Sequence, residues 1–130
     1  MAAWPVCGRR QLESQRADMA ISTHVLDMRL GRPAAGIRVQ LEQSERDEWR
    51  VVGSGVTNGD GRVANLLPDG VAITPGEYQL TFETRQYFAS SSTATFYPSV
   101  SIVFEAAAGQ SHYHVPLLLS PFGYTTYRGS

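Results

Sequence analysis

The sequence predicts an all-β sandwich. Short runs of alternating apolar and polar residues recur from residue 21 to residue 127, with glycine and proline turns between them. The chain shows no alternation of strands with helices, and no internal repeat with a period of roughly 20 to 50 residues. Together these observations indicate about seven or eight short strands, a number typical of an antiparallel sandwich.

Three strands are predicted in the first half of the chain. Alternation places the first strand at 21–27 and the second at 37–42, and a third strand includes 49–52. The turn between the first two lies at 31–33, because proline restricts φ and glycine accepts tight backbone geometry. The second strand has one apolar and one polar face, as expected for a sheet with one solvated side.

The second half contains further strands and one helical candidate. A glycine-rich tight turn at 57–62 leads into a short strand at 62–66. Alternating strands follow at 78–82 and 100–104. Residues 85–92 form the single segment whose pattern allows a helix, so we expect one short helix beside the strands.

The last two strands are predicted at 112–120 and 122–127. Pro121 lies at the turn between them, because proline lacks the N–H that a central strand position needs. His112 and His114 point to one face of their strand, and such a pair can bind a metal when a third ligand is close. No carboxylate lies in this stretch, so we expect no metal; two half-exposed strand histidines are the structural alternative.

Length and composition limit the domain organisation. The chain has 130 residues and a formal net charge of −1, which suit one domain and offer no basic surface for nucleic acid. No apolar run reaches the roughly 20 residues of a membrane helix. Residues 1–18 lack periodicity and a secretory apolar core, so we expect a disordered leader or targeting segment before a domain at 19–130. The predicted location is cytoplasmic or peroxisomal, without secretion.

The side chains available for chemistry favour general-base catalysis. All eleven basic residues are arginines, which excludes lysine chemistry, and the single Cys7 has no credible partner. A Gly-x-Ser-x-Gly elbow is also absent. The remaining scheme uses histidine to activate water and arginine to polarise a carbonyl. His24 and Arg62 are candidates, although a structural strand histidine and a solvated loop arginine are the alternatives.

The C-terminal tail, residues 127–130, forms a second candidate site. Chain ends usually fray, because few contacts offset the entropy lost on ordering them. This tail follows the apolar run at 115–119 and carries a phenol, a guanidinium and a hydroxyl beside the terminal carboxylate. We therefore expect the tail to be docked, with its polar groups in a site.

Nearly all of the chain from residue 21 to residue 130 resembles the transthyretin-related family, and within it the 5-hydroxyisourate hydrolases. The closing Tyr-Arg-Gly-Ser is highly specific when it follows the His-Val-Pro-Leu-Leu-Leu run. The landmarks are Ser22-Thr23-His24-Val25-Leu26-Asp27, Gly31-Arg32-Pro33-Ala34, Thr57-Asn58-Gly59-Asp60-Gly61-Arg62, Phe96-Tyr97-Pro98, and His112-Tyr113-His114-Val115-Pro116-Leu117-Leu118-Leu119-Ser120-Pro121 with Tyr127-Arg128-Gly129-Ser130.

The resemblance implies a transthyretin-like sandwich of two four-stranded antiparallel sheets, assembled as a homotetramer. The tetramer would be a dimer of dimers with active sites in the channel between them. The implied reaction is hydrolysis of 5-hydroxyisourate to 2-oxo-4-hydroxy-4-carboxy-5-ureidoimidazoline in urate degradation, without metal or organic cofactor and without nucleic-acid or membrane partners. The alternative is a non-catalytic carrier, because transthyretin itself binds an iodinated hormone in the equivalent channel.

The family's site residues carry over by position. The resemblance implies catalytic roles for His24, Arg62, His114 and Ser130, with His24 and Arg62 also binding substrate. It further implies that Tyr127, Arg128 and Gly129 bind substrate, with His112 as an outer neighbour. Which histidine is the base stays open at this point, and His24 and His114 acting as a pair is the favoured arrangement.

Overall fold

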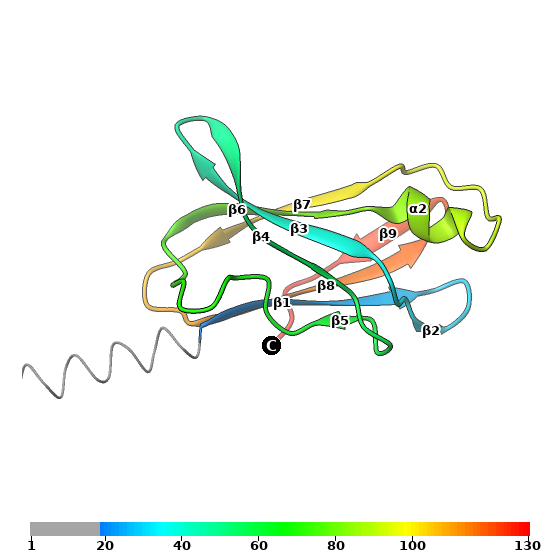
Figure 1. Ribbon diagram of the computed structural model, residues 1–130, viewed down its shortest axis with the longest axis horizontal. Helices are drawn as coiled ribbons and strands as arrows, with labels where there is room; N and C mark the ends of the chain where they lie inside the picture. Colours follow the sequence, from blue (N-terminus) through cyan, green and yellow to red (C-terminus); the bar gives the residue numbers. More distant parts are fainter. Residues whose placement is uncertain (1–18) are drawn as a thin grey trace, which may run out of the picture.

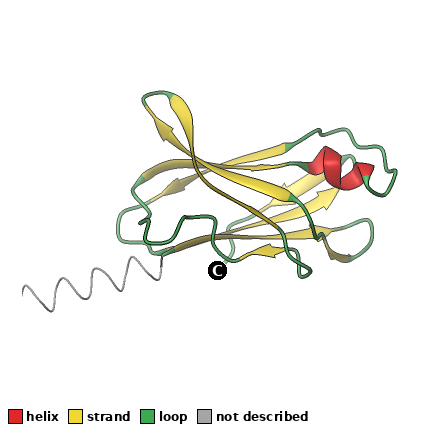
Figure 2. Cartoon of the chain, in the orientation of Figure 1, coloured by secondary structure: helices red, strands yellow, loops and turns green. Residues whose placement is uncertain are grey.

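The computed structural model describes residues 19–130, which form two sheets packed face to face with one short helix (Figures 1 and 2). The predicted leader at 1–18 lies outside the described residues. The first sheet has the order β2-β1-β8-β9, with β5 also pairing with β1, and the second has the order β4-β3-β6-β7. The elements are β1 (Ala20–Asp27), β2 (Arg32–Pro33), β3 (Arg38–Glu45), β4 (Glu48–Val56), β5 (Arg62–Val63), β6 (Gly76–Phe82), α2 (Thr84–Ala89), β7 (Val100–Ala106), β8 (His112–Ser120) and β9 (Gly123–Thr126).

The predicted all-β sandwich with one short helix is confirmed, and so are the 112–120 boundaries of β8. The expectation of purely antiparallel sheets was wrong, because β1 and β8 pair in parallel. A parallel pair needs a long crossover connection, and here most of the chain supplies it. Two of the five strands in the first sheet, β2 and β5, have only two residues each, which is too short to produce an alternating pattern. The segment at 31–33, which was predicted as a turn, includes the short strand β2.

Alternation along the strands determines which side chains enter the core. In β1 every second residue, beginning with Ile21, is buried, and the intervening residues are half-buried on the outer face. In β8 the core-facing series begins with Tyr113. The second sheet contributes the other wall of the core. Its fully buried members are Val39, Leu41, Tyr78, Leu80, Phe82 and Val100. At about 1.5–3 kcal/mol for each fully buried large apolar side chain, this burial holds the strand faces in place.

A buried carboxylate joins the end of β1 to the helix α2. Asp27 is fully buried, and its Oδ1 accepts hydrogen bonds from the backbone N–H groups of Arg29 (2.9 Å) and Leu30 (3.1 Å). Its Oδ2 accepts a hydrogen bond from the Tyr87 hydroxyl at 2.7 Å and lies 3.6 Å from the Arg29 guanidinium. These partners compensate the desolvation of the carboxylate, which would otherwise be costly.

Between residues 19 and 130, no helix has the length and apolar character needed to cross a membrane.

We expect the Tyr87 hydroxyl to make the stability of this fold sensitive to alkaline pH. Burial, followed by the hydrogen bond to Asp27 and its charge, raises the pKa of Tyr87 from 10.0 to about 12. The neutral phenol is favoured in the folded state, so its contribution is complete below pH 10 and is lost as the pH rises through about 12.

Replacing Tyr87 by phenylalanine should lower the free energy of unfolding at pH 8 by about 1–3 kcal/mol, because Asp27 then loses a hydrogen-bond donor. The variant should also lose part of the decline in stability between pH 10 and 12. Urea unfolding followed by circular dichroism across this range measures both effects. Parallel pH curves for the two proteins would contradict the assignment.

Candidate active site

Strand register brings the candidate catalytic residues to one face of the first sheet. In the antiparallel pair of β1 and β5, His24 lies opposite Arg62. In the parallel pair of β1 and β8, Ser22 lies opposite His114. Paired residues on neighbouring strands project to the same face, and alternate residues of one strand do as well. His112, His114, Ser22, His24 and Arg62 therefore share the face turned away from the core.

The turn before β5 positions Arg62. The backbone N–H of Arg62 donates to Asn58 Oδ1 at 3.0 Å, and Gly61 carries the turn up to β1, where its carbonyl accepts from the Val25 N–H at 2.7 Å. Gly61 has φ = +75°, and a Cβ at this position would lie 2.4 Å from the Val25 carbonyl oxygen. Position 61 thus requires glycine for two reasons: its backbone is left-handed, and it lies very close to the backbone of Val25.

The C-terminal tail returns along β8 and packs against His114. Gly129 donates its N–H to the His114 carbonyl at 2.9 Å, and the two residues form an isolated β-bridge. A Cβ on Gly129 would lie 2.4 Å from Cδ2 and 3.1 Å from Cγ of the His114 ring. The φ of Gly129 is not positive, so contact with the imidazole, rather than backbone freedom, requires glycine.

Arg128 anchors the tail on the other side of the strand. Its guanidinium carbon lies 5.4 Å from the centroid of the Tyr113 ring, a cation–π distance, and Tyr113 faces the core. Tyr127 and Arg128 also line a cavity of about 320 Å³ together with residues of β7, β8 and β9, among them Tyr113 and His114. The tail therefore contacts β8 at two neighbouring residues, since Arg128 packs on Tyr113 and Gly129 packs on His114.

An open cavity of about 620 Å³ lies where the tail meets the histidine face. Its lining consists of Gln110, His112, His114, Arg128, Gly129 and Ser130. The described part of the chain contains no group of three histidine, cysteine, aspartate or glutamate side chains that could hold a metal ion. Imidazoles, a guanidinium and the terminal residue are thus the groups available for chemistry at this cavity.

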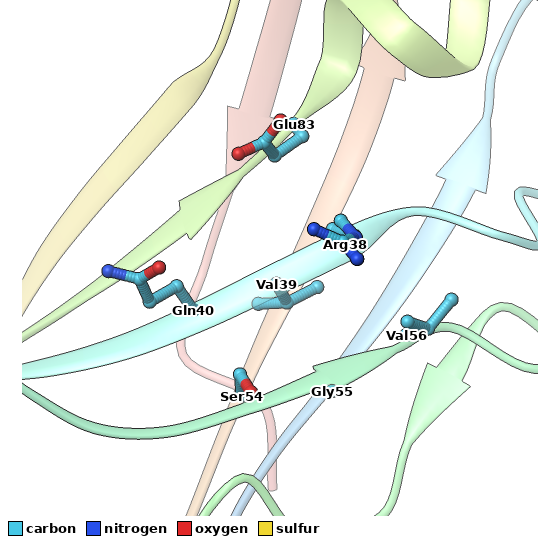
Figure 3. Close-up of a pocket in the computed structure, with 7 residues that line it drawn as sticks. All are labelled: Arg38, Val39, Gln40, Ser54, Gly55, Val56 and Glu83. Carbon is cyan, nitrogen blue, oxygen red and sulfur yellow. The ribbon is translucent and has the colours of Figure 1, made fainter.

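A second polar pocket, of about 240 Å³, lies on the other sheet (Figure 3). Its lining comes from β3, β4 and the end of β6, and includes one guanidinium, Arg38, and one carboxylate, Glu83. It contains no histidine and none of the site residues predicted from the sequence. The histidine face of the first sheet is therefore the better candidate for catalysis.

The electrostatic environment keeps His114 neutral near pH 7. Burial is the largest cause that lowers the pKa of His114 below 6.5, and the positive charges of Arg62, His24 and His112 lower it further. A hydrogen bond to the backbone of Ser22 acts in the opposite direction. A neutral imidazole can accept a proton, which a general base must do at neutral pH.

The structure brings together most of the residues predicted from the sequence. His24, Arg62 and His114 share one sheet face, and Gly129 and Ser130 lie at the cavity beside His114. Tyr127 is exposed, and it lines the 320 Å³ cavity, which His114 also lines.

Sequence reasoning missed Ser22, whose Oγ lies 2.8 Å from His114 Nδ1. Alternation alone places Ser22 on the face of His24, two residues away. Its contact with His114 depends on the parallel pairing of β1 with β8, which the sequence pattern did not predict.

These features describe a transthyretin-like sandwich that carries a histidine–arginine site on the outer face of one sheet. Residues 21–129 match the model of the HIUase/Transthyretin family, and the chain belongs to this family. It is 46% identical over 110 residues to the 5-hydroxyisourate hydrolase of Salmonella typhimurium, covering 85% of this chain and 80% of that protein. The corresponding mouse enzyme is 43% identical over 112 residues, covering 85% of this chain and 94% of that protein.

Two kinds of solved structure resemble this fold equally well. The Klebsiella pneumoniae 5-hydroxyisourate hydrolase superposes with a TM-score of 0.74 at 34% identity, covering 85% of this chain and 98% of that chain. Sea bream transthyretin in complex with thyroxine gives a TM-score of 0.78 at 32% identity, covering 84% of this chain and 93% of that chain. The fold alone thus does not separate enzyme from carrier, and the site residues must do so.

Proposed function

We propose that this protein hydrolyses 5-hydroxyisourate to 2-oxo-4-hydroxy-4-carboxy-5-ureidoimidazoline in urate degradation. The observation that carries the proposal is the group formed by His114, Arg62 and His24, in which burial and neighbouring positive charge keep His114 neutral. Curated relatives 43–46% identical to most of the chain are named 5-hydroxyisourate hydrolases. The reaction opens a ring at an amide C–N bond, which requires an activated water and stabilisation of an oxyanion.

In the proposed mechanism, neutral His114 accepts a proton from water as the water oxygen attacks the ring carbonyl. His24 on the neighbouring strand completes the pair and helps to orient the water. Arg62 offers a planar set of donors to the oxyanion that develops at the attacked carbon, and its permanent charge suits this role. No metal or organic cofactor takes part.

The tail contributes the remaining substrate contacts in this scheme. Ser130 lines the 620 Å³ cavity with His114, so its hydroxyl and the terminal carboxylate are available to position substrate or water. Tyr127, Arg128 and Gly129 bind substrate through the tail's backbone and exposed groups. Arg128 also holds the tail against Tyr113, at a ring-centroid distance of 5.4 Å.

Carrier function is the less supported candidate. The similarity to a transthyretin in complex with thyroxine gives it a basis in fold. However, the cavity is lined by His112, His114 and Arg128, and His24 and Arg62 act on His114 from the same sheet face. Such polar surroundings suit a polar substrate better than an apolar hormone.

Hydrolysis has a direct test. Urate oxidase generates 5-hydroxyisourate in situ from urate, and its ultraviolet absorbance decays as the ring opens. We expect the protein to accelerate this decay well beyond the spontaneous rate, and His114→Gln to remove most of the acceleration because glutamine cannot act as a base. Decay at the spontaneous rate in the presence of wild-type protein would refute the proposal.

Gly129→Ala should lower kcat/KM by about a hundredfold, because a displacement of about 1 Å in a catalytic group has an effect of this size. The new Cβ would occupy the space of the His114 ring, 2.4 Å from Cδ2. Gly123→Ala is the matched control, since its Cβ would meet nothing within 4 Å and its φ is not in the left-handed region. Equal activities of the two variants would show that the contact between Gly129 and His114 has no functional role.

A homotetramer, built as a dimer of dimers, is part of the proposal. β7 and β9 are the last strands of their sheets, so within residues 19–130 each leaves one edge unpaired. Apolar side chains are exposed on or next to these strands, including Val103 (51%), Phe122 (71%) and Tyr124 (40%). Unpaired, apolar edges favour pairing with a second copy.

Light scattering at micromolar concentration should give four times the mass of one chain. Val103→Lys should dissociate the assembly, because it places like charges near each other across a paired β7 edge. Val51→Lys is the control, since Val51 is comparably exposed (56%) but lies on β4, at the opposite edge of the same sheet. A stable wild-type monomer at this concentration would contradict the assembly.

A further inference from the structure

The imidazole of His114 is held along two of its edges. On one edge, Nδ1 lies 2.8 Å from Ser22 Oγ on the neighbouring strand. On the other, Cδ2 and Cγ pack against Gly129, which leaves no room for a side chain there. The edge that remains is Cε1–Nε2, the part of the ring furthest from its own backbone. Among residues 19–130, the one hydrogen bond of this ring to another side chain is the bond to the Ser22 hydroxyl.

The surroundings of Ser22 favour one direction for that hydrogen bond. Its Oγ also lies 3.5 Å from the carbonyl oxygen of Tyr113, which can only accept. When the hydroxyl donates to this carbonyl, its lone pairs remain for a donor, and Nδ1–H of His114 is the donor in reach. The 3.5 Å separation is long for such a bond, so it biases the direction rather than imposing it.

We propose that Ser22 is a positioning residue for the hydrolysis, holding His114 in the tautomer with the proton on Nδ1 and leaving the Nε2 lone pair for the attacking water. The inference rests on the proposed function for its catalytic meaning. It assigns a role to a residue that does not itself touch the substrate. The partner of a histidine nitrogen determines which of the two nitrogens carries the proton.

The proton balance follows from this arrangement. The water oxygen forms a bond to the ring carbonyl carbon, and a water proton passes to Nε2 of His114. The C–N bond then breaks, and the departing ring nitrogen takes a proton back, which returns the imidazole to neutrality. While His114 is charged, its Nδ1–H continues to donate to Ser22 Oγ, which stabilises the imidazolium.

Several charged groups act on the same imidazole. Arg62 on β5, His24 on β1 and His112 on β8 disfavour its protonation. Arg128 and the terminal carboxylate of Ser130 lie in the tail that lines the same cavity. Ser22 is a neutral partner, so it supports the charged form much less than a carboxylate would. The base therefore regains its neutral state readily near neutral pH.

The alternative is that the Ser22 hydroxyl only helps to hold β1 against β8. The neighbouring Thr23 already provides a side-chain link between these two strands. Thr23, fully buried on the core side, donates its hydroxyl to the Val115 carbonyl at 2.6 Å and already joins β1 to β8 by a side chain. Backbone pairing along β1 and β8 runs the whole length from Ala20 to Asp27. Ser22 lies on the outer face, where its hydroxyl contacts the catalytic ring.

The test compares wild type with Ser22→Ala, Ser22→Thr and Ser54→Ala. Threonine keeps the hydroxyl, whereas Ser54 is an exposed strand serine on the other sheet and controls for loss of a hydroxyl. Two-dimensional NMR of ¹⁵N-histidine-labelled protein reports which imidazole nitrogen is protonated, with His114→Gln used to assign the signals. The same samples provide kcat, KM and the titration of His114.

We expect Nδ1 to carry the proton in wild type, and Ser22→Ala to mix the two tautomers. In Ser22→Ala kcat should fall about tenfold with little change in KM, since a single hydrogen bond is lost. Ser22→Thr should restore the tautomer and kcat, and Ser54→Ala should match wild type.

Three results would overturn the inference. These are a wild-type His114 with its proton on Nε2, a Ser22→Ala variant with unchanged kcat, and a loss of kcat that leaves the tautomer unchanged. The NMR measurements need no substrate. If wild type failed to turn over 5-hydroxyisourate, the proposed function would fail separately, while the spectra would still decide whether Ser22 sets the tautomer.

Discussion

The parallel pairing of β1 with β8 is the constraint on which the rest of the site depends. It sets Ser22 beside His114 and carries every core residue of both strands inward. A shift of one residue would turn the histidines toward the core and apolar residues toward water. Burial of Ile21 and Leu117 therefore holds the register that catalysis needs. The same β1 also receives β5, so the position of Arg62 follows from the same strand.

Residues 127–130 are ordered beside the candidate active site. Ordering the last residues opposes the entropy of a free terminus, about 1–2 kcal/mol for each backbone unit. Contacts on both sides of β8 act against this cost: a cation–π contact of Arg128 with Tyr113, and a backbone hydrogen bond from Gly129. Neither contact needs a bulky group at residue 129, and the His114 ring leaves room only for glycine there. Residues 127–130 thus pack against β8 and also restrict the position of the His114 ring.

Architecture does not separate an enzyme from a carrier of this fold. Solved structures of a hydrolase and of a thyroxine-bound transthyretin resemble this sandwich almost equally, with TM-scores of 0.74 and 0.78. On one sheet face of this chain, burial and nearby positive charge lower the pKa of His114. A cluster of cationic groups also suits an oxyanion, so the features that keep the base neutral favour the charge that develops on the substrate.

Alternation with a period of two is a local property, so the amino-acid sequence indicated the β-sandwich and the face of each long strand. It also indicated one short helix, a short strand at the position of β5, the place of His24 opposite the core-facing side chains, and the shared face of His112 and His114. The motifs at both ends of the domain pointed to the family. The parallel pairing of β1 with β8, the two-residue strand β2, and the bond from Ser22 to His114 across 92 positions became visible in the folded structure alone. Such pairing depends on which edges meet when the core closes, and no local pattern contains that information.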